Sequence, residues 1–460
     1  MKYADIRRHG ALFSEYTELR VQEYRSITAG TLNGDVIANN RSASGGMSAR
    51  VYKDGLWGFA STPESSDAAI RAAILQATEN ARFLGSKAGR KTAPLPCRPG
   101  IGERSLATSK PRLDQKAYID FVRTIDAYLA TQYPFMKSRM VQASTADYEK
   151  TLLSSDGAES YSLIPRSLVY ASLTMEHEGE PFDLYEIFGG AGQFEDLFDR
   201  PETLYPKLDV LAERLQQKAK GVYAKPGEHE VILDSDLAGI LAHEAIGHTV
   251  EADLVLGGSV AADYMGKTVA SPLVTLVDFA NTALGRLCPV PLWIDDEGTD
   301  ARDAILIQDG VLKSYMHNKE SAAHFGVEPT GNARAYGFYD EPLIRMRNTA
   351  ILPGNSKLAD MIASVDNGYY FLQSSNGQAD STSEFMFGVV MGYEIKNGKL
   401  GAAVRDCTIS GVAFSMLQTI SMISDDMSWT GAGMCGKKQS IPVGMGGPAI
   451  KCRINVGGRA

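Results

Sequence analysis

Alternating hydrophobic and polar positions open the chain and predict paired strands. The alternation runs through four stretches, residues 18–27, 34–38, 48–52 and 56–60. A period of two is typical of strands with one buried face. Asp54-Gly55 separates the last two stretches, and this dipeptide between alternating runs is a strong hairpin signal. The sequence therefore predicts antiparallel strands at the start of the chain.

The hydrophobic period then becomes helical. Residues 67–84 are rich in Ala with apolar positions at helical spacing, and further helices are expected over 114–130 and 204–219. Residues 87–104 carry three prolines and are predicted to form a connector. More strands are expected from residue 137 to about 174, interrupted by a turn at Ser155-Asp156-Gly157.

The second half of the chain is dominated by short alternating runs. Strands are predicted at 230–233, 274–278, 304–309, 310–316, 369–373, 385–395 and 399–403. Asp309-Gly310 and Asn397-Gly398 are further hairpin signals. Turn-forming residues at 223–228 mark a boundary near residue 222.

We therefore expect an α+β protein of two domains. Residues 1–222 would form an N-terminal domain of antiparallel strands and helices. Residues 223–460 would form a C-terminal domain of mostly antiparallel sheet.

The candidate chemistry lies on one helix of the C-terminal half. A buried strand at 231–233 is followed by Asp234 or Ser235 as helix cap, and then by an Ala- and Leu-rich stretch that contains His243, Glu244 and His248. Two His residues flanking a Glu on a helix are typical of a zinc hydrolase. The imidazoles would hold the metal, which lowers the pKa of a bound water, and Glu244 would be the general base.

The spacing of the two histidines requires a distorted helix. His243 and His248 are five residues apart, which places them about 140° apart on a regular helix. A π-bulge restores facing between positions i and i+5. Gly247 stands directly before the second His, and we expect the distortion there. Otherwise only one His would bind metal.

A catalytic zinc site needs a third protein ligand. Glu251 follows His248 by three residues, and Cys435 lies between glycines in a stretch where the backbone can approach a crowded site. Thiolate suits zinc, although a buried Cys is often only a small hydrophobe. That second interpretation is preferred for the other cysteines, which are Cys97, Cys288, Cys407 and Cys452.

Composition limits the class of protein. The chain has 460 residues and a formal net charge of −9, without the basic footprint of a nucleic-acid binder. The N-terminus shows no secretory signal, and no apolar run approaches the ~18 residues that a membrane span needs. Five scattered Cys do not suggest a disulfide framework. We expect a cytoplasmic protein that binds neither nucleic acid nor membrane.

Several segments together resemble the TldD/PmbA family of metallopeptidases, once described as modulators of DNA gyrase. The segments are the His243–His248 motif with Glu251 and Asp253, and residues 296–299, 309–315, 331–334, 345–349, 393–399, 433–437 and 443–448. The resemblance is to the catalytic TldD-type subunit, because PmbA-type subunits lack the His motif. It implies zinc bound by His243, His248 and Cys435, with Glu244 as base. It also implies unfolded peptides as substrates, and a homodimer or a heterodimer with a PmbA-type subunit.

The residues leave more than one function open. The first hypothesis is a zinc-dependent peptidase acting on short or unfolded chains. The second is a regulatory scaffold with a structural metal, and the third is a metal-dependent amidase on non-peptide substrates. Structural zinc usually has four protein ligands, so three ligands beside a Glu favour the first.

Overall fold

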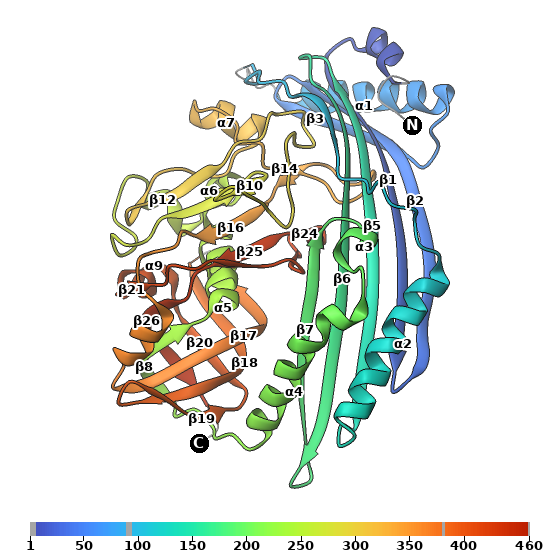
Figure 1. Cartoon of the computed structure of the whole chain (residues 1–460). Helices are drawn as coiled ribbons and strands as arrows, with labels where there is room; N and C mark the ends of the chain where they lie inside the picture. The colour runs from blue at the N-terminus through green and yellow to red at the C-terminus, as the bar shows by residue number, and fades with distance from the viewer. Residues whose placement is uncertain (1–5, 89–93, 380–381, 459–460) are drawn as a thin grey trace.

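The computed structural model describes residues 6–88, 94–379 and 382–458, and it shows the expected α+β class. A long, curved sheet forms one side of the molecule, and two smaller sheets stack on the other side (Figure 1). The chain enters the second half after helix α4, whose end lies near strand β19 (Lys399–Val404). The division at residues 222 and 223 falls between α4 and the next strand, and it stays a prediction.

The N-terminal sheet has the order β3-β2-β1-β5-β6-β4, and β7 also pairs with β6. All pairs are antiparallel except β4 with β6. The strands are β1 Tyr16–Leu32, β2 Asp35–Lys53, β3 Leu56–Thr62, β4 Ile101–Ser105, β5 Ser138–Ser154, β6 Glu159–His177 and β7 Glu180–Ala191. The hairpin at Asp54-Gly55 is confirmed, and both residues have the positive φ angles, 50° and 84°, of a type I′ turn.

One prediction for this sheet was wrong. The stretches 34–38 and 48–52 are not separate strands but parts of β2. The Asn-, Ser- and Gly-rich middle of β2 is exposed, so it lacks the alternation that marks a half-buried strand. Its backbone nevertheless pairs with β1 almost without a break, for example Asn39 with Ala29. Pairing with a long neighbour outweighs weak local strand propensity.

Three long helices pack on this sheet. The predicted helices are confirmed as α1 Asp67–Ala88, α2 Gln115–Gln132 and α4 Tyr205–Ala219. Helix α1 packs on β2 and β3, α2 on β1 and β5, and α4 on β6 and β7. The predicted connector 87–104 was drawn too long, because α1 continues to Ala88 and β4 begins at Ile101. Residues 89–93 of that connector lie outside the described residues.

The C-terminal half contains a closed barrel. The strands β17, β8, β26, β20 and β18 pair in that order, and β18 pairs back to β17. Their bounds are β8 Gly227–Leu233, β17 Asn367–Ala379, β18 Glu384–Lys396, β20 Cys407–Val412 and β26 Ile450–Gly457, with β19 Lys399–Val404 and β21 Met422–Ile423 attached. Most pairs are antiparallel, but β8 runs parallel to β17. Closure leaves few free edges.

A six-stranded sheet lies above the barrel, in the order β13-β12-β9-β16-β25-β22 (Figure 1). Its strands are β9 Leu276–Phe279, β12 Ala304–Gln308, β13 Val311–Leu312, β16 Asn348–Ile351, β22 Ser428–Thr430 and β25 Gly444–Gly447. The predicted strand 310–316 is wrong beyond Leu312. The backbone N–H of Met316 donates instead to Val250, in the segment after the candidate helix.

Shorter elements complete this half. The two-residue strands are β10 Thr282–Ala283, β11 Arg286–Leu287, β14 Ala333–Arg334, β15 Leu343–Ile344, β23 Met434–Cys435 and β24 Ile441–Pro442. The short α-helices of this half are α5 Ser235–Ile240, α6 Ala252–Leu256, α7 Lys319–Phe325, α8 Leu358–Ala363 and α9 Ala413–Gln418, and a further short helix, α3 Phe194–Leu197, belongs to the N-terminal half. Helix α5 contacts both β17 of the barrel and β25 of the six-stranded sheet, and so lies at the centre of the largest hydrophobic core.

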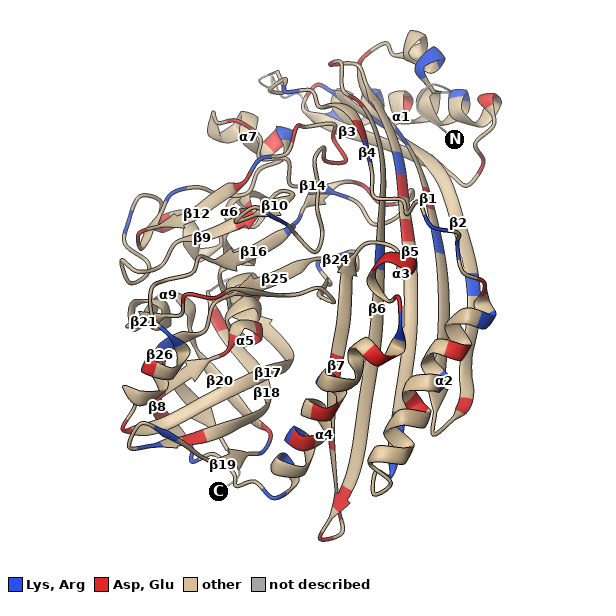
Figure 2. Cartoon of the chain, viewed as in Figure 1, with Lys and Arg blue, Asp and Glu red and all other residues tan. Residues whose placement is uncertain are grey.

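Buried ion pairs join the two halves. Lys150 of β5 lies 2.7 Å from Asp296, and Lys319 of α7 lies 2.6 Å from Asp156 in the β5–β6 turn. Charged residues of both signs are interspersed along the long strands (Figure 2). Within the described ranges, no helix combines the length and the apolar character needed to cross a membrane.

All five cysteines are free, as the sequence predicts. Cys288, Cys407 and Cys452 are buried in the core. The interpretation of Cys97 as a core residue was wrong, because it is exposed and its thiol lies 3.6 Å from the Asp156 carbonyl oxygen. It belongs to an extended segment that crosses the surface, which a proline-rich sequence favours.

Candidate metal centre

The candidate helix begins as the sequence predicts. Asp234 caps α5, because its side chain accepts a hydrogen bond of 2.9 Å from the backbone N–H of Leu237. Burial, and then the charge of Asp236, raises the pKa of Asp234 to about 7. The cap fixes where the helix starts, and therefore which residues face the core.

The helix continues as a π-helical segment, Leu241–Gly247. The backbone N–H of His248 donates to the carbonyl oxygen of His243, five residues earlier. This geometry confirms the expected distortion and brings the two imidazoles to within 5.2 Å between ring centroids.

Packing explains why a glycine stands at position 247. A Cβ there would overlap the Met346 sulfur and lie 3.2 Å from the Ala242 carbonyl oxygen. Met346 is completely buried, so it has little space to withdraw. The distorted turn is thus packed against Met346, which lies two residues after β15. The sequence identified the glycine but not the neighbour that requires it.

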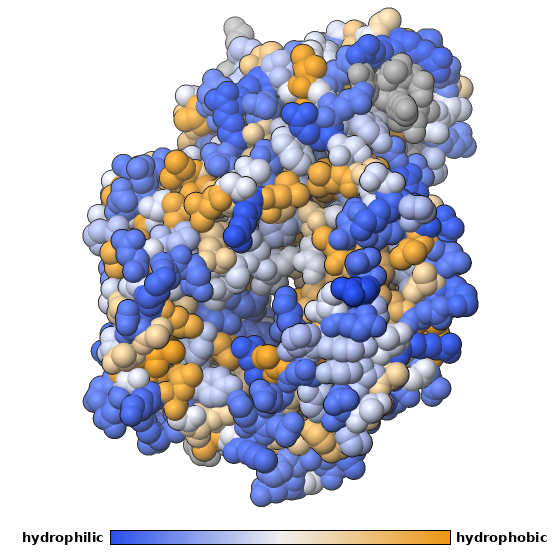
Figure 3. Space-filling view, in the orientation of Figure 1, coloured by the Kyte–Doolittle hydropathy of each residue, from blue (hydrophilic) through white to orange (hydrophobic). Residues whose placement is uncertain are grey.

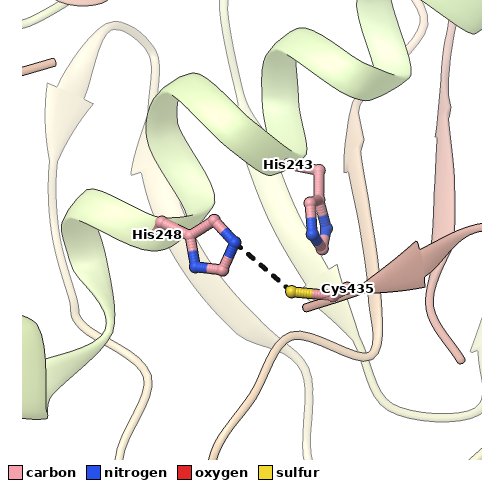
Figure 4. A group of neighbouring side chains, drawn as sticks. All are labelled: His243, His248 and Cys435. Atoms are coloured by element: carbon pink, nitrogen blue, oxygen red, sulfur yellow. Dashed lines mark hydrogen bonds between the residues drawn. The ribbon is translucent and has the colours of Figure 1, made fainter. Parts of the chain in front are cut away.

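Cys435 reaches the two histidines from a distant part of the chain. It ends the short strand β23, and its sulfur lies 3.3 Å from Nε2 of His248 (Figure 4). The ligand atoms of His243, His248 and Cys435 all lie within 4.8 Å of one another. Figure 4 shows both rings and the thiol directed toward a common space. The structure therefore brings together the three residues that the resemblance implies.

Glu251 lies on the other side of His248. Its carboxylate is completely buried and is 2.8 Å from Nδ1, whereas Nε2 faces Cys435. Nζ of Lys437 lies 3.2 Å from the Glu251 carboxylate and 2.7 Å from that of Asp253. This ammonium group holds the Glu251 carboxylate in place. Glu251 is therefore placed to orient His248 rather than to join the thiol and the second imidazole around one ion.

The donor set fits a zinc ion. His243 is buried, and neither of its ring nitrogens has a hydrogen-bond partner among the described residues. Buried polar atoms without a partner are uncommon and call for an explanation such as an ion. Burial alone would raise the pKa of the Cys435 thiol, but the two neighbouring imidazoles lower it to about 3. A thiolate and two imidazoles suit zinc and leave a fourth position open.

Glu244 lies beside this group at the end of a cleft. Its side chain is 23% exposed, and its oxygens are 3.6 Å from Nε2 of His248 and 4.0 Å from Nε2 of His243. The cleft has a volume of about 580 Å³. Figure 3 shows the surface hollowed near its centre, between the two halves of the molecule. Among Glu244 and the three candidate ligands, Glu244 is the residue that lines the cleft.

Two sheet edges border the cleft. Its lining includes Tyr185 to Ile187 of β7, the strand that pairs only with β6, and Ser428 to Thr430 of β22, which ends the six-stranded sheet. The cleft residue Asp236 accepts hydrogen bonds from Ser374 and Thr430 and ties its walls together.

Sequence reasoning missed the residues that hold the ligands. Arg345 is completely buried, and its guanidinium donates to the Cys435 carbonyl oxygen at 2.7 Å and to that of Gln439 at 2.8 Å. Lys437 supports Glu251 as described above. Both stand in segments that resemble the family, but only the folded chain shows what they contact.

Two sequence profiles of known protein families match the chain. A sequence profile described as the PmbA/TldA metallopeptidase C-terminal domain matches residues 226–458, which is just over half of the chain. A second profile, described as PmbA/TldA metallopeptidase domain 1, matches residues 17–81.

The chain belongs to the TldD/PmbA metallopeptidase family.

Other members are similar along nearly the whole chain. A metalloprotease of Methanocaldococcus jannaschii is 30% identical over 448 residues, which cover 95% of this chain and 96% of that protein. A zinc metalloprotease TldD homolog of Saccharolobus solfataricus is 29% identical over 464 residues, covering 99% and 96%. Membership and these relatives place the chain among the metallopeptidases in general.

Solved structures of the TldD/PmbA fold superpose well. A Thermotoga maritima protein described as a candidate modulator of a DNA gyrase matches with a TM-score of 0.78 at 20% identity, covering 99% of this chain and 98% of that one. TldE from Thermococcus kodakarensis matches with a TM-score of 0.75 at 18% identity, covering 99% of each. At such identities the likeness shows the fold alone.

Proposed function

We propose that this protein is a zinc-dependent peptidase of the catalytic TldD type, with His243, His248 and Cys435 as ligands and Glu244 as general base. The observation that carries the proposal is the approach of three donor atoms to within 4.8 Å beside a partly exposed carboxylate. Naming of a relative as a zinc metalloprotease supports the choice of metal.

Different residues of the chain have different roles in the proposed hydrolysis. A bound zinc ion would supply Lewis-acid chemistry and a water of lowered pKa. Glu244 follows a ligand directly and can accept a proton from a water at the cleft end, then deliver it to the leaving amine. Glu251 accepts a hydrogen bond from Nδ1 of His248 and so keeps Nε2 turned toward Cys435.

The substrate should be an unfolded or short peptide in extended form. The cleft is bordered by the edge strands β7 and β22, and such edges pair with any backbone. A folded protein satisfies its backbone groups internally and cannot offer them to an edge. Loose sequence preference follows from recognition through the backbone.

The main test compares Glu244→Gln with the wild type on a mixed peptide pool, read by mass spectrometry with and without chelator. Gln keeps the size but cannot take the proton, so cleavage should fall roughly 10²–10⁴-fold while zinc content is unchanged. Glu79→Gln, at an exposed position on α1, is the matched control and should be fully active. Zinc binding without any cleavage by the wild type would favour the scaffold hypothesis instead.

A second test addresses the state of the substrate. One sequence is offered both as a free peptide and within a stable folded domain. The free form should be cleaved and the folded form should resist. Equal cleavage of both would remove the requirement for an extended substrate, while leaving the metal chemistry intact.

We also propose that the working form is at least a dimer, either of two identical chains or with a PmbA-type subunit. Support comes from the likeness to TldE, which is a separate protein of the same fold. Light scattering at micromolar concentration should give a mass well above the 49.7 kDa of one chain, alone or after mixing with such a partner. A mass of one chain under both conditions would contradict assembly.

A further inference from the structure

Arg166 links the N-terminal sheet to the segment that carries Cys435. It lies on β6 and is 9% exposed. Its Nε donates to the carbonyl oxygen of Gly431 at 2.9 Å, and Nη2 contacts the carbonyl oxygens of both Gly431 and Gly433. Nη1 lies 3.5 Å from the Met434 sulfur. One guanidinium thus holds three of the four residues directly before Cys435.

Arg166 makes this contact without an acidic partner. Within the described part of the chain, no carboxylate lies within ion-pair distance of its guanidinium. Burial lowers the pKa of Arg166, and the tyrosines around it, Tyr148, Tyr24 and Tyr336, oppose that effect. A buried cation without a counter-charge is costly unless hydrogen bonds compensate. Here the compensating acceptors are the loop carbonyls.

The loop has little rigidity of its own. Glycines stand at 431, 433 and 436, and β23 is only two residues long. A Cβ at Gly431 would lie 2.9 Å from the carbonyl oxygen of Gly189 on β7, so the loop lies tightly against the N-terminal sheet. On its other side, Arg345 holds the Cys435 carbonyl oxygen. Cys435 is therefore fixed from two sides by two buried arginines.

The same loop also forms part of the cleft wall. Thr430, Gly431 and Met434 line the cleft that ends at Glu244. A loop released from β6 would sample many conformations, since each freed residue gains backbone entropy. Only the fraction of molecules with the thiol beside His243 and His248 would bind metal with three ligands. Apparent metal affinity falls in proportion to that fraction.

We propose that Arg166 is a positioning residue that holds the Gly431–Met434 backbone so that Cys435 completes the metal site. The N-terminal sheet thereby sets the metal affinity of a centre whose ligands all lie in the C-terminal half. This inference rests on the ligand set proposed above. It concerns how the third ligand is kept in place, and not the chemistry of hydrolysis.

The test is a cobalt(II) titration of the full-length, metal-free protein, because cobalt bound to thiolate gives a sulfur-to-metal charge-transfer band in the near ultraviolet. Arg166→Gln replaces the buried guanidinium with a neutral side chain, so no buried charge is left without a partner. It should weaken cobalt binding by about 10–100-fold, as loss of a supporting residue does, and should reduce the charge-transfer band at saturation. Arg166→Lys keeps the charge and one donor nitrogen, so it should recover part of the affinity and part of the band.

Two further variants make the outcome specific. Arg139→Ala removes an arginine of similar burial from the neighbouring strand β5, where it pairs with Asp126, and should leave the titration unchanged. Cys435→Ser gives the spectrum of a site without thiolate. Circular dichroism checks that each variant is folded. If Arg166→Gln does not fold, the cobalt titration of Arg166→Lys is the deciding measurement. Lysine preserves the charge but cannot span the carbonyl oxygens of both Gly431 and Gly433.

The results separate this inference from the proposed function. A wild-type titration without a charge-transfer band would overturn the ligand assignment itself. A normal wild-type band, with unchanged affinity and band intensity in folded Arg166→Gln and Arg166→Lys, would overturn only the role of Arg166.

Discussion

The two segments that carry the proposed metal ligands are built in opposite ways. His243 and His248 lie on one π-helical segment, surrounded by the largest hydrophobic core of the molecule. Cys435 lies on a two-residue strand between glycines, and buried arginines hold its backbone. The helix is positioned by local packing, whereas the loop is positioned by hydrogen bonds from distant residues. One centre therefore depends on two different kinds of support.

Removal of a ligand on either segment should have the largest effect on metal binding. His248→Ala and Cys435→Ser should each weaken zinc binding by more than about 100-fold, beyond the 10–100-fold typical of supporting residues. Isothermal titration with zinc measures the affinity. Thermal unfolding of the zinc-free proteins is the control, and Cys435→Ser should have the smaller effect on Tm. Equal loss of stability would show that the loop is as integral to the core as the helix.

A larger side chain at position 247 should destabilise only the segment that carries His243 and His248. In Gly247→Ala, the new methyl group meets the buried Met346 and the Ala242 carbonyl oxygen. The free energy of unfolding should fall by about 1–3 kcal/mol in urea titrations. Gly436→Ala is the matched control, because a Cβ there meets nothing within 4 Å.

Met346→Ala provides the complementary test of the same contact. The double variant Gly247→Ala with Met346→Ala should lose less stability than the sum of the two single losses, because the sites share one contact. Strict additivity would mean that the contact between helix and Met346 is not what excludes a side chain at 247.

Weakening the support of one histidine should have a smaller effect. In Glu251→Gln, the side chain can still accept a hydrogen bond from Nδ1 of His248, but it loses the charge that makes the imidazole a stronger ligand. Zinc affinity should fall by about 10-fold, measured by competition with a chelating dye. An affinity loss as large as that of Cys435→Ser would instead point to Glu251 as a ligand.

The last expected effect is a change in the pH dependence of stability, caused by the carboxyl group at the helix cap. Because the pKa of Asp234 is raised to about 7 in the folded protein, the unfolded chain loses this proton first as pH rises. The group therefore lowers stability progressively between about pH 4 and pH 7. Asp234→Asn retains a capping oxygen and should remove that part of the slope. Parallel stability curves for both proteins in urea, from pH 4.5 to 8, would contradict the assignment.

Local signals explain what the sequence could predict. The hairpin at Asp54-Gly55 and the cap at Asp234 depend on neighbours within a few residues, and both are confirmed. The five-residue spacing of the histidines also predicted the π-helical turn, on the condition that both residues bind one metal ion. In each case the physical cause lies within the segment that shows the pattern.

Long-range contacts explain the rest. The exposed middle of β2 is a strand because β1 pairs with it, and no local pattern shows this. The closing pair β17–β18 makes a barrel from runs that, in sequence, predict only antiparallel sheet. The role of Arg166 depends on a loop 265 residues away, so its own neighbourhood in the sequence carries no trace of it.

Barrel closure also has a consequence for the timing of biosynthesis. Strand β8 leads directly into the helix of His243 and His248, yet its partner β26 begins only at Ile450. Because a ribosome makes the chain from the N-terminus onward, β8 must wait for more than 200 further residues before both of its neighbours exist. The centre cannot form its final surroundings while the polypeptide is still being translated. The proposed cleavage of extended chains would therefore begin only after this chain has itself ceased to be extended.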